Sequence, residues 1–258
     1  MKFCPIASGS SGNCVYVGAG DTHLLVDAGI SGRRIETALK QIKVPRLSGI
    51  LVTHEHSDHA LGVGIMSRRF NLPVYATPHT WRFFLRHGTI GNVAENLQKT
   101  VIPGEPAAIG GIEVVPFDVP HDASQPVGYC LRTQNCSAAV ATDMGYVTDT
   151  VRSLLRDVNV LLIESNHDIE MLENGRYPKE LKERVKGPRG HLSNVAAGAL
   201  LVEIANTCRH VFLGHLSEEN NRPMIALDTV QNILESNDIQ INHLYVADRH
   251  EPSALIEF

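Results

Sequence analysis

The chain has 258 residues, 43% of them hydrophobic and 20% charged, which is the composition of an ordinary globular protein. This length suffices for one large domain or two small ones, and no segment reaches the roughly 18 consecutive apolar residues of a membrane span. The formal net charge of −5 excludes a molecule that is basic all over and binds nucleic acid by charge alone. The N-terminus lacks the features of a signal peptide and the five cysteines form no CxxC pair, so we expect a cytoplasmic protein with reduced thiols.

Short apolar runs rich in β-branched residues recur between Gly, Pro, Asn and Asp residues, and this pattern predicts strands. They cover residues 14–18, 23–29, 48–54, 72–78, 112–117, 127–133, 137–143, 158–165, 210–215 and 243–248. Segments with helical periodicity predict helices over residues 33–42, 58–70, 79–87, 149–157, 191–206 and 223–236. Tight turns join the early strands, whereas the later strands alternate with helices. We therefore expect one α/β domain, residues 1–258, in which helices cover stacked sheets.

Five of the predicted strands are followed by side chains that can carry chemistry. These are Asp27, His54, Asp143, Glu164 and His215. In layered α/β folds the loops just beyond the strand ends form the site, because rigid strands aim them at one crevice. The sequence therefore predicts a site built from several strand ends.

The segment "THEHSDHALG" (residues 53–62) contains an HxHxDH motif made of His54, His56, Asp58 and His59. Two histidines one residue apart at a strand exit can bind one ion, and the Asp–His pair can reach a second. Imidazole and carboxylate are typical ligands of zinc, with manganese or iron as further possibilities. The alternative is a polar loop in which Asp58 caps a helix, but capping requires no histidine.

This motif, with "LLVDAG" before it, resembles the metallo-β-lactamase superfamily, which has a four-layer αββα sandwich fold. The resemblance implies two divalent ions. His54, His56 and His121 would hold the first ion, Asp58, His59 and His215 the second, and Asp143 would bridge them, while Asp27 would steady the ligating histidines from behind. Aspartate at the bridging position is typical of phosphoesterases and thioesterases and speaks against antibiotic hydrolysis.

A second histidine, His191 in "GHLSN", competes with His215 for the role of ligand. The segment is similar to the glycine–histidine–serine–threonine helix of ribonuclease Z relatives, although Leu192 stands where they have serine. That similarity implies that His191 contacts the scissile phosphate and assists the leaving group, with Ser193 and Asn194 beside the substrate. A helix N-terminus favours an anion and an imidazolium can supply a proton. The alternative is an ordinary helix cap with a surface histidine.

The N-terminal segment "SGSSGN" (residues 8–13) can form a backbone anion nest, in which Ser11 and Asn13 would contact substrate, or it is a plain hairpin turn. Together with "THEHSDH", "ESNHD" and "GHLSN", it closely resembles the YycJ/WalJ group over essentially the full chain. The resemblance implies a bacterial 5′-to-3′ DNA exonuclease with a link to mismatch repair. In "ESNHD", His167 either lines the substrate cleft or hydrogen-bonds behind it.

Residues 179–189 ("KELKERVKGPR") carry five basic and two acidic side chains. They form either a solvated helix face with Glu–Lys pairs or an arm that contacts phosphates. We predict a two-metal phosphodiesterase that acts on a DNA 5′ end, with Asp58 or Asp143 orienting the attacking water and His191 protonating the leaving oxygen. The rivals are a cyclic-phosphate phosphodiesterase, a glyoxalase II-like thioesterase and a regulatory protein stabilised by metal. The oligomeric state does not follow from the sequence.

Overall fold

The computed structural model describes residues 1–204 and 208–258, and the chain divides into two compact units. Unit 1 comprises residues 1–118, 123–136 and 248–258, and unit 2 comprises residues 119–122 and 137–247. The expectation of one domain over residues 1–258 stays a prediction. In the described residues no helix is long and apolar enough to cross a membrane.

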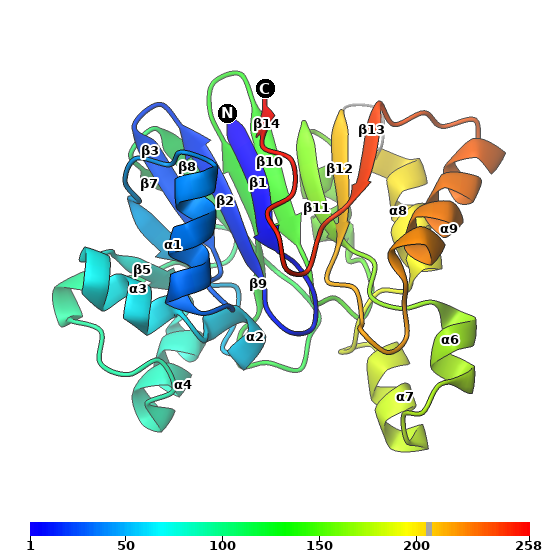
Figure 1. Ribbon diagram of the computed structural model, residues 1–258, viewed down its shortest axis with the longest axis horizontal. Coiled ribbons are helices and arrows are strands. Elements are labelled where there is room, and N and C mark those ends of the chain that lie inside the picture. Colours follow the sequence, from blue (N-terminus) through cyan, green and yellow to red (C-terminus); the bar gives the residue numbers. More distant parts are fainter. Residues whose placement is uncertain (205–207) are drawn as a thin grey trace. The chain divides into compact units, whose positions relative to one another are not determined.

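Unit 1 contains a seven-stranded mixed sheet with the strand order β14-β1-β2-β3-β4-β5-β6 (Figure 1). Its strands are β1 (Lys2–Ala7), β2 (Cys14–Ala19), β3 (Thr22–Val26), β4 (Gly49–Leu51), β5 (Val74–Ala76), β6 (Gln98–Thr100) and β14 (Ile256–Glu257). The first three strands are antiparallel, because tight turns join them, and β3 to β6 are parallel. All residues of β3 and β4 are buried, as continuous apolar runs in a covered sheet require.

The remaining elements of unit 1 are five helical segments and an antiparallel meander. They are α1 (Gly32–Gln41), α2 (Ser57–Ala60), α3 (Val63–Phe70), α4 (Pro78–His87), the 3₁₀ turn η1 (Glu95–Leu97), and strands β7 (Ala107–Ile109), β8 (Ile112–Asp118) and β9 (Val127–Arg132). Helix α1 begins at Ser31, whose hydroxyl accepts from Arg34 N, and α4 begins at Thr77 and ends at the left-handed Gly88. The apolar faces of these helices pack against the first sheet and form one continuous core with it.

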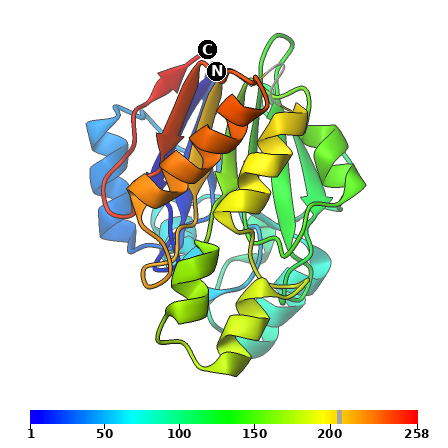
Figure 2. The same cartoon turned by 90° about the vertical axis from the view of Figure 1, so that its right-hand side faces the viewer.

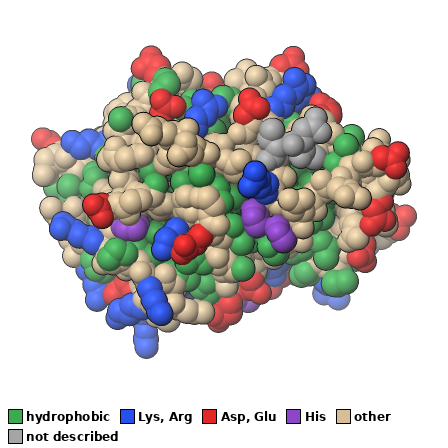
Figure 3. Space-filling view, turned by 90° about the horizontal axis from the view of Figure 1, so that it is seen from above, with side chains coloured by type: hydrophobic (Ala, Val, Ile, Leu, Met, Phe, Trp, Pro, Cys, Tyr) green, Lys and Arg blue, Asp and Glu red, His purple; other side chains and the backbone are tan. Residues whose placement is uncertain are grey.

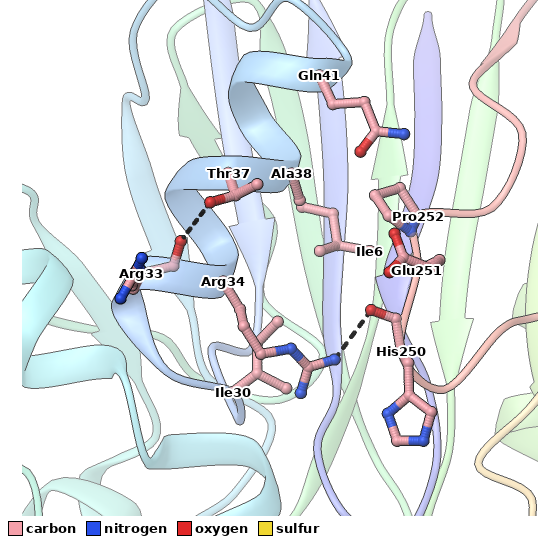
Figure 4. Close-up of a pocket in the computed structure, with 10 residues that line it drawn as sticks. All are labelled: Ile6, Ile30, Arg33, Arg34, Thr37, Ala38, Gln41, His250, Glu251 and Pro252. Atoms are coloured by element: carbon pink, nitrogen blue, oxygen red, sulfur yellow. Dashed lines mark hydrogen bonds between the residues drawn. The ribbon is translucent and has the colours of Figure 1, made fainter.

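The C-terminal segment returns to unit 1 and pairs with the N-terminal strand, where Phe3 is opposite Ile256. Arg34 of α1 donates a hydrogen bond to the His250 carbonyl, 3.1 Å away, across a pocket of about 200 Å³ (Figure 4). The backbone N–H of Ser8 donates to Asp248 O at 3.0 Å. These contacts hold α1 and the loop after β1 against the C-terminal segment.

Unit 2 consists of parallel strands and helices in the order β13-β12-β11-β10. Its elements are β10 (Ser137–Ala141), β11 (Val160–Glu164), β12 (His210–Gly214), β13 (His243–Val246), α5 (Asp149–Leu155), α6 (Ile169–Asn174), α7 (Lys179–Lys186), α8 (Asn194–Ile204) and α9 (Pro223–Ser236). Helices α8 and α9 lie side by side (Figure 2). Gly198 lies at their contact, because a Cβ there would lie 2.8 Å from Ile233 Cδ1 and that side chain would have to shift.

The α/β class and all ten predicted strands are present, whereas two helix predictions need comment. The helix predicted over residues 58–70 is wrong, since α2 and α3 are separate. The helix is interrupted around Gly62, whose N–H donates to Ala28 O. A Cβ on Gly62 would lie 2.5 Å from Ile30 O. The helix predicted over residues 191–206 begins at Asn194, and residues 205–206 lie outside the described part of the chain.

Candidate metal centre

In unit 1 three imidazole rings gather where the chain passes from β4 into α2. His54 Nε2 lies 3.0 Å from His56 Nδ1, and the ring centroids of His54 and His59 are 4.1 Å apart. His54 and His59 are buried, while His56 occupies the N-cap position of α2. Asp58 also belongs to this cluster, because one of its carboxylate oxygens lies 3.4 Å from His59 Nε2. The four HxHxDH residues are therefore brought together locally.

A buried carboxylate, Asp27, orients this loop from behind. Asp27 Oδ2 lies 2.7 Å from His59 Nδ1, and its two oxygens accept from the Thr53 N–H and hydroxyl at 2.8 and 2.9 Å. Burial raises the pKa of Asp27, although His59 and Thr53 oppose this shift. With Nδ1 engaged, His59 presents Nε2, which is the arrangement typical of a metal-ligating histidine.

The loop of residues 8–13 supports the same cluster through its backbone. The Asn13 N–H donates to Asp58 O at 2.7 Å, and its side-chain amide donates to Gly9 O at 3.1 Å. A Cβ on Gly29 would lie only 1.6 Å from Asp58 O, so the chain before α1 packs directly against the motif. Asn13 is thus buried in a structural network while Ser11 is exposed, and their roles toward substrate stay predictions.

Unit 2 contains a second cluster of potential ligands at the ends of its strands. Asp143, Glu164, His191 and His215 each offer one ligand atom, and these atoms all lie within 4.8 Å of one another. Glu164 ends β11, whereas Asp143 follows β10 and His215 follows β12. Oxygen and imidazole donors at this spacing match the ligand preferences of zinc, manganese and iron.

Left-handed backbone recurs at the strand ends that carry these groups. Asp27 and Asp143 have φ of 61°, and His215 has φ of 54°. This region is uncommon for residues other than glycine, although Asp and His are among those that enter it. Such conformations cluster at functional sites because the surrounding structure must hold them in place. The same left-handed conformation thus occurs at a polar residue that follows β3, β10 and β12.

Glu164 organises the unit 2 cluster. Its Oε1 lies 2.7 Å from His191 Nδ1 and 2.9 Å from His215 Nδ1, and its Oε2 accepts from the Met144 N–H at 2.8 Å. Burial alone would raise the pKa of Glu164, but the charge and hydrogen bonds of the two histidines lower it to about 2. Burial lowers the pKa of His191, but Glu164 outweighs this effect and raises the pKa above its usual value. Both histidines therefore present Nε2, and the choice between them as ligand stays a prediction.

The histidine predicted as a distant ligand, His121, also belongs to unit 2. Its Nε2 lies 3.6 Å from Asp143 Oδ1, and its Nδ1 lies 3.2 Å from Gly190 O. Burial lowers the pKa of His121, which favours the neutral imidazole that a metal ion requires. His121 is thus placed beside Asp143, and its role as a metal ligand stays a prediction.

The other substrate candidates of unit 2 hold the start of α8. His167 pairs with Ser193 as an isolated bridge, and the Asn194 N–H donates to His167 O at 2.9 Å. The Asn194 side chain accepts from the Ser165 hydroxyl at 2.6 Å. His167 and Asn194 are buried. Their contacts are those of a supporting network, and contact with substrate stays a prediction.

The basic segment of residues 179–189 forms α7 and the turn after it. Arg184 pairs with Asp122 at 2.6 Å, and Lys186 pairs with Glu173. Lys179 and Glu183 lie 3.7 Å apart, as i,i+4 partners do. On the face drawn in Figure 3, basic and acidic side chains are interspersed in a similar way. Most of this segment is thus a solvated helix face with paired charges, the first of the two alternatives.

The sequence places Glu164 at a strand end but does not indicate its role. The signal was present, because an acidic residue that ends the wholly buried strand "VLLIE" must find partners. The partners themselves, His191 and His215, lie 27 and 51 residues further along the chain. Only the fold reveals that one carboxylate orients both of them.

Comparison with known proteins identifies the family. Residues 22–215 match the family model described as a β-lactamase superfamily domain. The chain is 39% identical over 255 residues to the exodeoxyribonuclease YycJ of Bacillus anthracis, covering 98% of this chain and 96% of that protein. It is 38% identical over 244 residues to the exodeoxyribonuclease WalJ of Streptococcus pneumoniae, covering 93% and 91%. The predicted resemblance to the YycJ/WalJ group is confirmed.

Solved structures show the same fold. The metallo-β-lactamase fold protein YhfI from Bacillus subtilis matches with a TM-score of 0.72 at 14% identity, covering 98% of this chain and 99% of that one. Human tRNase Z, short form, matches with a TM-score of 0.69 at 14% identity over the full length of both chains. At such identities the likeness concerns the fold alone, and it confirms the predicted fold class. The chain belongs to the β-lactamase superfamily, as a hydrolase with the metallo-β-lactamase fold.

Proposed function

We propose that the chain is a metal-dependent exodeoxyribonuclease that degrades DNA from the 5′ end. The observation that carries this proposal is the near full-length identity of 38–39% to two proteins named exodeoxyribonucleases. The clusters of imidazole and carboxylate groups in each unit support a hydrolytic rather than a purely structural role. A cytoplasmic location and a part in mismatch repair are the finer proposals that accompany this activity.

The ligand set proposed for two divalent ions is the one that the resemblance to the metallo-β-lactamase superfamily implies. His54, His56 and His121 would hold the first ion and Asp58, His59 and His215 the second, with Asp143 shared. The support is local: His59 and His215 each have Nδ1 engaged by a buried carboxylate. Zinc is proposed first and manganese or iron next, because imidazole predominates among the donors.

The chemistry divides between the ions and the side chains. When bound, divalent ions polarise a phosphodiester and lower the pKa of an attacking water. Asp58 or Asp143 would orient that water. His191 would donate a proton to the leaving oxygen, and its contact with Glu164 favours this role because the carboxylate raises the pKa of the imidazole.

The experiment is a substrate panel with the metal-loaded enzyme. We expect 5′-phosphorylated single-stranded DNA to be shortened from its 5′ end with Mn²⁺ or Zn²⁺, with mononucleotides as the first products. A strand carrying a 3′ label should keep that label until late in the reaction. Intact DNA alongside turnover of a cyclic nucleotide or of a thioester would overturn the proposal in favour of a small-molecule hydrolase.

A further inference from the structure

Tyr146 is an exposed aromatic residue close in sequence to the unit 2 cluster. It follows Asp143 by three residues, so its Cα lies within about 11 Å of the Asp143 Cα. Its exposed fraction is 51%, higher than that of any other Phe, Tyr or Trp side chain among the described residues. No hydrogen bond, ion pair or ring contact involves its side chain within that part of the chain. About half of this side chain is therefore accessible to a ligand.

The backbone on both sides of Tyr146 is held in place. The Met144 N–H donates to Glu164 Oε2 at 2.8 Å, and the Gly145 N–H donates to Pro120 O at 2.9 Å. Two residues beyond Tyr146, the Thr148 hydroxyl caps α5 by accepting from the Val151 N–H. An exposed ring on a fixed loop is a preorganised surface, because little conformational entropy is lost when a ligand stacks on it.

An exposed cation lies near the same loop. A Cβ on Gly145 would lie 2.3 Å from the carbonyl carbon of Pro188, so the loop of Tyr146 touches the turn that carries Arg189. The two Cα atoms of Tyr146 and Arg189 are consequently within roughly 12 Å of each other. Arg189 is exposed, and in the described residues its side chain has no acidic partner, in contrast to Arg184.

We propose that Tyr146 stacks on an unpaired base of the DNA strand while Arg189 contacts an adjacent phosphate. The inference rests on the proposed function and names how its substrate is held. Aromatic rings stack on every base, so this contact tolerates any sequence but requires the base to be unpaired. Arginine supplies the charge that a neighbouring phosphate needs. Tyr146 is therefore a positioning residue that selects single-stranded ends.

The test separates binding from hydrolysis. The full-length, metal-loaded protein is titrated with a 5′-phosphorylated oligothymidylate that carries cleavage-resistant phosphorothioate linkages and 2-aminopurine at its second position. We expect quenching of the 2-aminopurine by the wild type and by Tyr146→Phe. Tyr146→Ala should lose the quenching and bind about 5- to 150-fold more weakly, which is the range for loss of one stacked base. Met224→Ala, which removes another exposed apolar side chain of unit 2, should bind within twofold of the wild type.

A strand with an abasic second position completes the cycle. Wild type and Tyr146→Ala should bind this strand equally, and with normal DNA Tyr146→Ala should raise KM more than it lowers kcat. The inference would be overturned if the wild type and Tyr146→Ala bound the normal strand equally, or if Tyr146→Ala lost as much affinity for the abasic strand as for the normal one. In either case nuclease activity of the wild type would leave the proposed function standing. A wild type that neither binds nor cleaves DNA would overturn both.

Discussion

Glu164 shows how one side chain determines the chemistry of several others. Its carboxylate is fully buried, and it receives hydrogen bonds from two imidazoles and from the backbone N–H groups of Met144 and Leu192. A buried carboxylate without such partners would be protonated instead. Because Nδ1 of each histidine is engaged, both rings are fixed and their Nε2 atoms are directed toward ligands.

Glu164→Gln should impair the cluster without changing its volume. The amide retains one oxygen, so it can no longer accept from both histidines and from the backbone. We expect a 10- to 100-fold loss of metal affinity or activity, measured by metal titration and DNA hydrolysis. Glu173→Gln, an exposed change on α6, is the matched control and should behave like the wild type. Unchanged metal affinity and rate in Glu164→Gln would contradict the role given to this carboxylate.

The buried imidazole of His167 should make the free energy of unfolding depend on pH. Burial lowers the pKa of its imidazole to about 4, whereas an unfolded histidine titrates near 6.5. As the pH falls from about 6.5 toward 4, the unfolded chain takes up a proton that the folded chain refuses. The free energy of unfolding should therefore decrease over this window, by at most about 1.4 kcal/mol per pH unit. NMR titration should place the pKa near 4, and the slope should be smaller in His167→Gln. Titration of this ring near 6.5 in the folded protein would contradict the argument.

At the scale of elements, the site depends on loops that are tied to one another by backbone. The loop of residues 8–13 and the segment before α1 both bond to residues 58–59. The Ala28 N–H donates to His59 O at 2.9 Å, and the Gly29 N–H donates to Asn13 O at 2.7 Å. The HxHxDH loop therefore cannot move without moving the end of β3.

Gly29→Ala should break this arrangement. The added methyl would lie 1.6 Å from Asp58 O, and backbone cannot give way as a flexible side chain can. We expect the free energy of unfolding to fall by about 1–3 kcal/mol, together with nuclease activity, as measured by denaturant titration and DNA hydrolysis. Gly111→Ala in the same unit has its nearest contact at 3.8 Å and should change stability by less than about 0.5 kcal/mol. Equal stability of the two variants would show that the loop is not packed as described.

The elements that the sequence predicted well are those with a local signal. Strands such as β11 are continuous apolar runs. The four ligand-capable residues of the HxHxDH motif lie within residues 54–59. The break between α2 and α3 has no local signal in the sequence because its cause is remote: the Gly62 N–H donates to the carbonyl of Ala28, which lies 34 residues earlier in the chain. The shared carboxylate of Glu164 and the burial of Asn13 depend on packing between distant segments in the same way.

At the scale of the whole molecule, metal binding and stability should be linked. Ions that bind the folded chain alone stabilise it by about 2.7 kcal/mol at 100 times the dissociation constant. We expect EDTA to lower the Tm of the protein as purified, and added Zn²⁺ or Mn²⁺ to restore it. His87→Gln removes an exposed histidine of unit 1 and should retain the full shift, whereas His215→Gln should lose much of it. A Tm that is independent of metal in the wild type would contradict the assignment of these clusters to metal binding.

The central claim is that the chain hydrolyses DNA by means of its metal-binding carboxylates and histidines. The most direct measurement is the initial rate of mononucleotide release from 5′-phosphorylated single-stranded DNA, at saturating Mn²⁺, for the wild type, Asp143→Ala and Glu173→Gln. We predict release by the wild type and by Glu173→Gln and none above background by Asp143→Ala, with folding verified by circular dichroism. Equal rates in the wild type and Asp143→Ala, or no release by the wild type with any metal, would contradict the account.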